Sequence, residues 1–251
     1  MRSLSRLFLA AVFVAAVVSA TGAQPASPPY TPFEIAVACA PPPTLDVPDA
    51  QFHLIGAQDV APKTEFANRD LLVIDGGTAA GVRLGQQFFV RRANRFGTSD
   101  GAVRRGSRTL GWLRVVAVND STAIAAIDHI CSPLKRDDYL EPFVAPRVPA
   151  GAESNEVTGE PDFNALGRIV VGDEGRSEMG AGDFALIDRG TQQGVAPGAR
   201  FALYRDVKVT GMPLASVGEL VVISTGATMS LTRITRAQGP ITTGDYVAPR
   251  R

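Results

Sequence analysis

The stretch IDGGTAAGVRLGQQF, residues 74–88, returns later in the same chain as IDRGTQQGVAPGARF, residues 187–201. Eight of the fifteen positions are identical at a constant offset of 113 residues. Both copies run on to an arginine, Arg92 in the first and Arg205 in the second. A repeat of this length indicates that one structural unit occurs twice in the chain.

The residues shared by the two copies are typical of a tight turn between strands. Glycine adopts positive φ values that other residues resist, and aspartate accepts hydrogen bonds from nearby backbone N–H groups. We therefore expect the glycines to shape the turn and each aspartate to cap it. The turn residues are Asp75, Gly77, Gly81 and Gly85 in the first copy and Asp188, Gly190, Gly194 and Gly198 in the second.

Segments with the composition of short strands surround both copies in the same order. Residues 70–74 and 183–187 precede the turn, and residues 87–91 and 201–205 follow it. The polar residues 93–109 then predict a long hairpin arm, which is six residues shorter in the second unit.

Beyond this arm the offset falls to 107, where Gly111 matches Gly218 and Asp138 matches Asp245. Duplication of a folded unit leaves this signature, a conserved order of motifs with one length change inside a loop. Convincing helical periodicity is absent after residue 23. The strand spacing therefore predicts an all-β fold of two tandem small β-barrels.

These patterns divide the chain into five parts. They are a signal peptide at 1–23, a proline-rich N-terminal arm at 24–44, a first β-barrel repeat at 45–146, a linker at 147–161 and a second β-barrel repeat at 162–251.

Residues 1–23 have the three parts of a secretory signal. Arg2 and Arg6 precede an apolar run at residues 7–18, and small residues at 21–23 offer a cleavage site, with Ala20 as the alternative. That run is too short to span a membrane comfortably, and no later segment reaches about 18 apolar residues. We expect an exported mature chain without a transmembrane segment, located in the periplasm or outside the cell.

Composition bounds the class of protein. Apolar residues make up 45% of the chain, which is enough for packed cores. Removal of residues 1–23, which hold two arginines and no acid, leaves 23 basic and 25 acidic residues. A net charge near −2 argues against a dedicated nucleic-acid-binding protein.

Cys39 and Cys131 are the only cysteines. In an exported protein they predict one disulfide, although two free thiols are the alternative. Cys39 lies within the proline-rich arm, and eight prolines fall within residues 24–50. We expect an extended arm, with a short edge strand at residues 33–37 that the disulfide attaches to the first barrel. A proline-rich binding motif for a partner is the alternative reading of the arm.

Patterns for catalysis, metals and nucleotides are weak. The glycine-rich turn lacks the lysine and the following helix of a phosphate-binding loop. The two histidines, His53 and His129, fall in predicted strands of the first unit. Glu219 and Asp245 form an acid pair that the first unit does not repeat, since Trp112 replaces Glu219. We predict no catalytic residue, no metal and no cofactor.

Arginines are dense around the first hairpin. Guanidinium groups pair well with phosphate and carboxylate oxygens, so this hairpin is a candidate site for an anionic partner. The alternative is a solvated hairpin whose charges protect an exposed strand edge. The residues are Arg91, Arg92, Arg95, Arg104, Arg105, Arg108 and Arg114.

The repeated motif resembles the C-terminal β-domain of the flagellar assembly protein T. It is also similar to related repeat modules of exported bacterial envelope proteins that carry lysin motifs. The second unit matches over roughly residues 165–249, whereas the first departs by its longer hairpin and by Trp112. The resemblance implies SH3-like barrels in the cell envelope that serve assembly or attachment rather than catalysis.

We therefore expect an exported, non-enzymatic module that binds or scaffolds a cell-envelope component, either an anionic glycan or a protein. Two alternatives stay open. One is a structural subunit of a secreted or surface assembly, and the other is a hydrolase whose site the sequence does not reveal.

Overall fold

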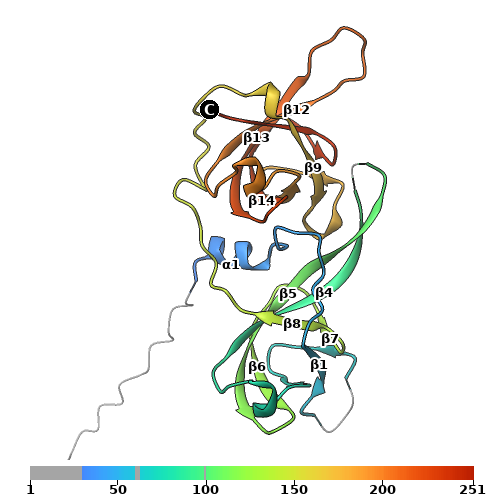
Figure 1. Ribbon diagram of the computed structural model, residues 1–251, viewed down its shortest axis with the longest axis vertical. Helices are drawn as coiled ribbons and strands as arrows, with labels where there is room; N and C mark the ends of the chain where they lie inside the picture. The colour runs from blue at the N-terminus through green and yellow to red at the C-terminus, as the bar shows by residue number, and fades with distance from the viewer. Residues whose placement is uncertain (1–29, 60–62, 99) are drawn as a thin grey trace, which may run out of the picture.

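The computed structural model describes residues 30–59, 63–98 and 100–251, which form two closed antiparallel barrels (Figure 1). The predicted signal peptide, residues 1–23, and the arm as far as residue 29 lie outside the described residues. The predicted all-β class is confirmed. The barrels follow one another along the long axis of the molecule, with one helix, α1, between them (Figure 1).

Six strands close the first barrel in the order β1-β3-β6-β5-β4-β8. A separate pair, β2 (Glu65–Phe66) and β7 (Leu134–Lys135), flanks it. The barrel strands are β1 (Phe52–Ala57), β3 (Leu71–Ile74), β4 (Gln87–Gly97), β5 (Val103–Val118), β6 (Ala123–Ile130) and β8 (Tyr139–Pro142).

The second barrel repeats this topology strand for strand, in the order β9-β11-β14-β13-β12-β16. A flanking pair, β10 (Glu178–Met179) and β15 (Ile241–Thr242), is present here too. Identical topology with matching registers confirms the internal duplication. The strands are β9 (Gly167–Gly172), β11 (Phe184–Ile187), β12 (Arg200–Arg205), β13 (Ala215–Thr225), β14 (Ser230–Ala237) and β16 (Tyr246–Pro249).

Four short 3-10 helices complete the described elements. Two of them, η1 (Thr78–Ala80) and η4 (Thr191–Gln193), lie within the repeated turns, and η2 (Phe163–Ala165) and η3 (Asp173–Gly175) flank β9.

The repeated glycines have two different roles. Gly81 and Gly194 end the 3-10 turns with φ values of 85° and 77°, the left-handed region expected of glycine. Gly77 instead has an extended backbone, and a Cβ atom there would lie 2.2 Å from the carbonyl oxygen of Asn119. Glycine is therefore required at this position because the turn lies directly against the β5–β6 connection.

The two aspartates correct one prediction. Asp75 Oδ1 accepts a hydrogen bond from the backbone N–H of His53 at 2.6 Å, and Asp188 Oδ1 accepts one from Arg168 at 2.7 Å. Each carboxylate therefore joins the start of the turn to the first strand of its barrel, instead of capping the turn as predicted.

Residues 33–37 also differ from the prediction, because they belong to α1 (Pro32–Cys39) and not to an edge strand. Thr31 caps the helix, with its side chain accepting from the N–H of Glu34, whose carboxylate accepts in return from the N–H of Thr31. Pro32 stands at the first helical position, where its missing N–H costs nothing. This reciprocal capping starts a helix in a proline-rich segment.

Candidate functional site

Helix α1 packs between the barrels and contacts both. Ala38 is buried beside Phe89 and Trp112 of the first barrel. Phe33, on the same helix, stacks on Phe184 of the second barrel, with ring centroids 6.5 Å apart and planes 17° apart. The helix thus fills part of the space between the two barrels and contacts the surface of each.

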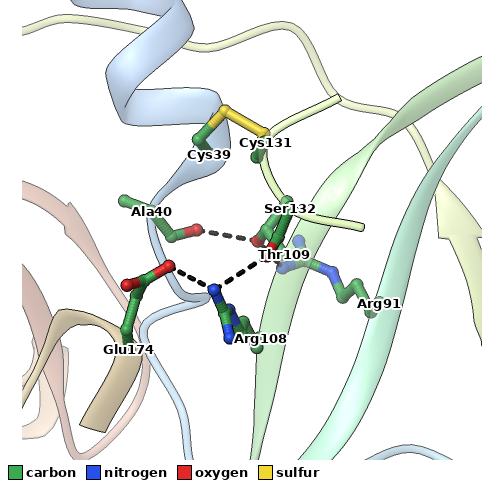
Figure 2. The surroundings of a disulfide bond; sticks show 8 residues. All are labelled: Cys39, Ala40, Arg91, Arg108, Thr109, Cys131, Ser132 and Glu174. Atoms are coloured by element: carbon green, nitrogen blue, oxygen red, sulfur yellow. Dashed lines mark hydrogen bonds and ion pairs between the residues drawn. A yellow bond between two sulfur atoms is a disulfide. The ribbon is translucent and has the colours of Figure 1, made fainter. Parts of the chain in front are cut away.

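The predicted disulfide between Cys39 and Cys131 is confirmed and holds the end of α1 on the first barrel (Figure 2). A chain of hydrogen bonds reinforces this attachment. Arg91 Nη1 donates to Thr109 Oγ1 at 2.6 Å, and Thr109 Oγ1 donates to the carbonyl oxygen of Ala40 at 2.8 Å. The arm is therefore fixed covalently and through β5.

The long first hairpin crosses to the second barrel (Figure 1). Phe96, on β4 near its tip, is only 7% exposed and belongs to an apolar cluster with Val171 and Leu186 of the second barrel. Arg108 forms an ion pair with Glu174 of the second barrel and donates to Ser132 Oγ at 2.8 Å (Figure 2). The extra length of this hairpin therefore joins the two barrels.

A cleft of about 540 Å³ remains between the barrels beside α1. The residues after α1, the segment 144–149 and strands β13 and β14 form its walls. Of its nineteen lining residues only four are polar: Arg91, Arg147, Ser224 and Thr225. A cleft of this size, largely apolar and with few polar groups, has the properties of a binding site.

Arg91 is the buried cation of this cleft, with 7% of its surface exposed. Its Nε lies 2.7 Å from Glu141 Oε2, although the N–H bond does not point along a hydrogen-bond direction. Its guanidinium carbon lies 4.7 Å from the centre of the Phe89 ring. Burial lowers the pKa of Arg91, and the carboxylate of Glu141 opposes this shift.

The other arginines of the predicted anion-binding hairpin do not form one open surface. Arg92 binds Asp138 through two hydrogen bonds of 2.6 and 2.8 Å. Arg104 pairs with Asp100 at 2.9 Å and Arg114 with Asp128 at 2.6 Å.

In the part of the chain that the structure describes, only Arg95 and Arg105 of the seven lack a carboxylate within ion-pair distance, and both are exposed. The sequence alone did not show that intramolecular acids bind five of the seven arginines.

The pair formed by Arg92 and Asp138 has an equivalent in the second barrel. Arg205 donates to both carboxylate oxygens of Asp245, at 2.7 and 2.5 Å. Burial raises the pKa of Asp138, and the hydrogen bond from Arg92 opposes that rise. The matched positions of these residues were the available sequence signal for a structural ion pair, but the pairing itself was missed.

The acid pair considered for catalysis has separate partners. Asp245 binds Arg205, whereas Glu219 binds Arg250 through contacts of 2.6 and 2.9 Å. Both side chains are buried. Asp245 therefore neutralises Arg205, whereas Glu219 neutralises Arg250 and lies 3.7 Å from Arg236.

The histidines lie apart from each other. His53 Nδ1 is 3.3 Å from Asp75 Oδ2, while His129 stacks on Trp112 with ring centroids 4.6 Å apart. Among the described residues, one group of three potential metal ligands gathers within 4.8 Å: Cys39, His129 and Cys131. The disulfide uses both sulfur atoms of this group, which leaves one histidine as a ligand.

Over the described ranges 30–59, 63–98 and 100–251, no helix is long and apolar enough to cross a membrane. Comparisons of the chain with protein-family models and with curated proteins find no match. The resemblance to the flagellar assembly module therefore stays a prediction.

Proposed function

We propose that this chain is an exported, non-enzymatic module that binds a component of the cell envelope in the cleft between its barrels. The observation that carries the proposal is the cleft itself, whose shape depends on a helix held by a disulfide. Export is supported by the secretory pattern of residues 1–23 and by the disulfide, which persists in oxidising compartments.

The chemistry of the cleft favours a protein partner over a glycan. Sugars present many hydroxyl groups, which need polar partners when they are buried. The cleft offers mainly Val, Ala, Pro and Ile side chains, with one buried guanidinium at Arg91. An apolar peptide segment that carries a carboxylate fits these walls, since Arg147 lines the cleft and has no carboxylate within ion-pair distance among the described residues, whereas Arg91 is already paired with Glu141.

A substitution in the cleft wall tests the proposal. Val144 lines the cleft and is 65% exposed, so Val144→Asp should leave folding intact while placing an unpaired carboxylate on an apolar wall. We expect retention on solubilised envelope proteins to fall on the order of tenfold or more. Retention would be measured by co-purification of the chain lacking residues 1–23, with isolated peptidoglycan as a second probe.

Leu84→Asp is the matched control, because Leu84 is 67% exposed and does not line the cleft. Equal retention of the wild type and Val144→Asp would exclude the cleft as the binding site. Loss of retention in Arg95→Glu with Arg105→Glu, and not in Val144→Asp, would move the site to the hairpin. No retention of the wild type on either fraction would refute the proposed function.

A further inference from the structure

The internal contact between the barrels has a donor and an acceptor. The first hairpin is the donor, and it places Phe96 on the outside of the second barrel. The acceptor is an apolar face on strands β9, β11, β13 and β14, where each residue is at most 6% exposed and where Phe96 shares the cover with α1, the residues after it and the linker. Its residues are Val171, Phe184, Leu186, Val221, Ile223 and Leu231.

The second barrel has its own hairpin, and nothing in the described chain covers it. The loop between β12 and β13 leaves Val207, Val209 and Met212 exposed by 42%, 58% and 62%. Figure 1 shows that both hairpins extend in the same direction, the first onto the second barrel and the second into open space. The second hairpin is therefore a donor without an acceptor within the chain.

The first barrel has the corresponding acceptor face, and this face is open. Strand registers place Val73 opposite Ile124, as they place Leu186 opposite Leu231 in the second barrel. Val116 lies at a bulge in β5, and Ile223 lies at the equivalent bulge in β13.

Four of the six acceptor positions remain apolar in the first barrel, and Gly56 and Arg114 occupy the other two. Leu71 is 39% exposed and Val116 is 44% exposed, whereas their counterparts in the second barrel are buried. Val73 and Ile124 are half-buried.

We propose that copies of this chain associate head to tail, with the second hairpin of one copy on the acceptor face of the first barrel of the next. This contact between molecules would repeat the contact that the first hairpin makes with the second barrel inside one chain. Such an interface joins two different surfaces, so it does not close a pair and extends into an open chain.

This contact should be weaker than the internal one. Inside the chain, α1 adds the stacking of Phe33 on Phe184, and the linker keeps both barrels at high effective concentration. Neither contribution exists between copies, so the interface belongs to the small, weak class. Association should therefore grow with protein concentration and become extensive only where copies are crowded.

Sedimentation velocity over a concentration series tests the proposal on the chain lacking residues 1–23. We expect the mean sedimentation coefficient of the wild type to rise with concentration. Met212→Asp blocks the hairpin and Val116→Asp blocks the acceptor face, so each variant alone should show no rise. Circular dichroism and thermal unfolding would verify that both variants fold.

Mixing the two variants is the decisive experiment. A copy with Met212→Asp keeps a working acceptor face and a copy with Val116→Asp keeps a working hairpin, so their mixture should form dimers and nothing longer. Val157→Asp, an exposed linker substitution, should behave as the wild type. A wild type that stays monomeric throughout, a single variant that still dimerises, or a mixture that stays monomeric would overturn the proposal.

Discussion

Three matched positions carry aromatic rings in the first barrel and charges in the second. Trp112 stacks on His129 and lies 5.6 Å from the ring of Phe143. In the second barrel a glutamate and two arginines form an ion-pair network at these places, with contacts of 2.6 and 3.7 Å. At the offset of 107 residues, Trp112 corresponds to Glu219, His129 to Arg236 and Phe143 to Arg250.

The difference follows from what covers each site. The aromatic group lies beneath α1 and the disulfide, where Ala38 and Ile35 pack on it. In the ionic group, Arg250 instead donates to the carbonyl oxygen of Gly159 in the linker. The same backbone therefore accommodates an apolar or an ionic cluster, because the neighbouring segment decides which one gains by burial.

Removal of the disulfide should have the largest effect on this comparison. Cys39→Ser with Cys131→Ser frees a loop closed over 92 residues, which the chain-entropy model values at about 4–5 kcal/mol of unfolding free energy. The first barrel should lose this stability. The second barrel should not, because it has Gln238 where the first has Cys131 and therefore contains no matching cysteine. Trp112, the only tryptophan, reports unfolding of the first barrel by fluorescence in urea.

Reducing agent on the wild type should reproduce that shift and leave the double variant unchanged. An unaltered tryptophan transition in both experiments would show that the disulfide does not support the aromatic cluster.

The two matched Arg–Asp pairs, in which the aspartate is buried, predict equal losses of stability in the two barrels. Arg92→Ala and Arg205→Ala each leave a carboxylate unpaired, on Asp138 or Asp245, whose side chains are 2% and 3% exposed. Each substitution should cost about 1–3 kcal/mol in its own barrel, because the lost hydrogen bonds join charged groups and the arginines are partly exposed. Hydrogen exchange followed by mass spectrometry would locate the loss.

Arg105→Ala serves as the control for both variants, since Arg105 is exposed and a surface change of this kind stays within about 0.5 kcal/mol. Losses that spread evenly over both barrels would contradict independent pairs.

The smallest predicted effect is a pH dependence of stability, which only the first barrel should show through His129. Burial lowers the pKa of His129 below 6.5, so at intermediate pH the unfolded chain binds more protons than the folded one. The stability that neutral His129 provides is complete above pH 6.5 and is lost as pH falls toward its lowered pKa. The second barrel has Arg236 at the matched position and no histidine there, so this slope belongs to the first barrel.

Urea unfolding of the wild type and of His129→Asn between pH 7 and pH 5, followed at Trp112, measures this slope. The variant should lose the part of the slope that the wild type shows below pH 6.5. Identical slopes in the two proteins would refute the assignment to His129.

Local signals in the sequence were sufficient for much of the fold. Positive φ at Gly81 and Gly85 and the strands on either side of the turn follow from residue type and alternation, which act over a few neighbours. Helix α1 was not predicted although Thr31, Pro32 and Glu34 form a recognisable helix start, because the prolines on both sides of it favour an extended backbone. The ion pairs of the arginines could not be predicted, because several of the acids involved are distant in the chain, such as Glu174 for Arg108.

By itself the sequence determined the duplication, the all-β class and the pair of cysteines, because repeated motifs and alternating apolar residues constrain a chain locally. Only the tertiary structure decided that the first hairpin joins the barrels, that α1 fills the space between them and that a cleft remains beside it. Those features arise from side chains far apart in the chain, such as Phe96 and Leu186, that share one buried surface, and no local pattern records which surfaces meet.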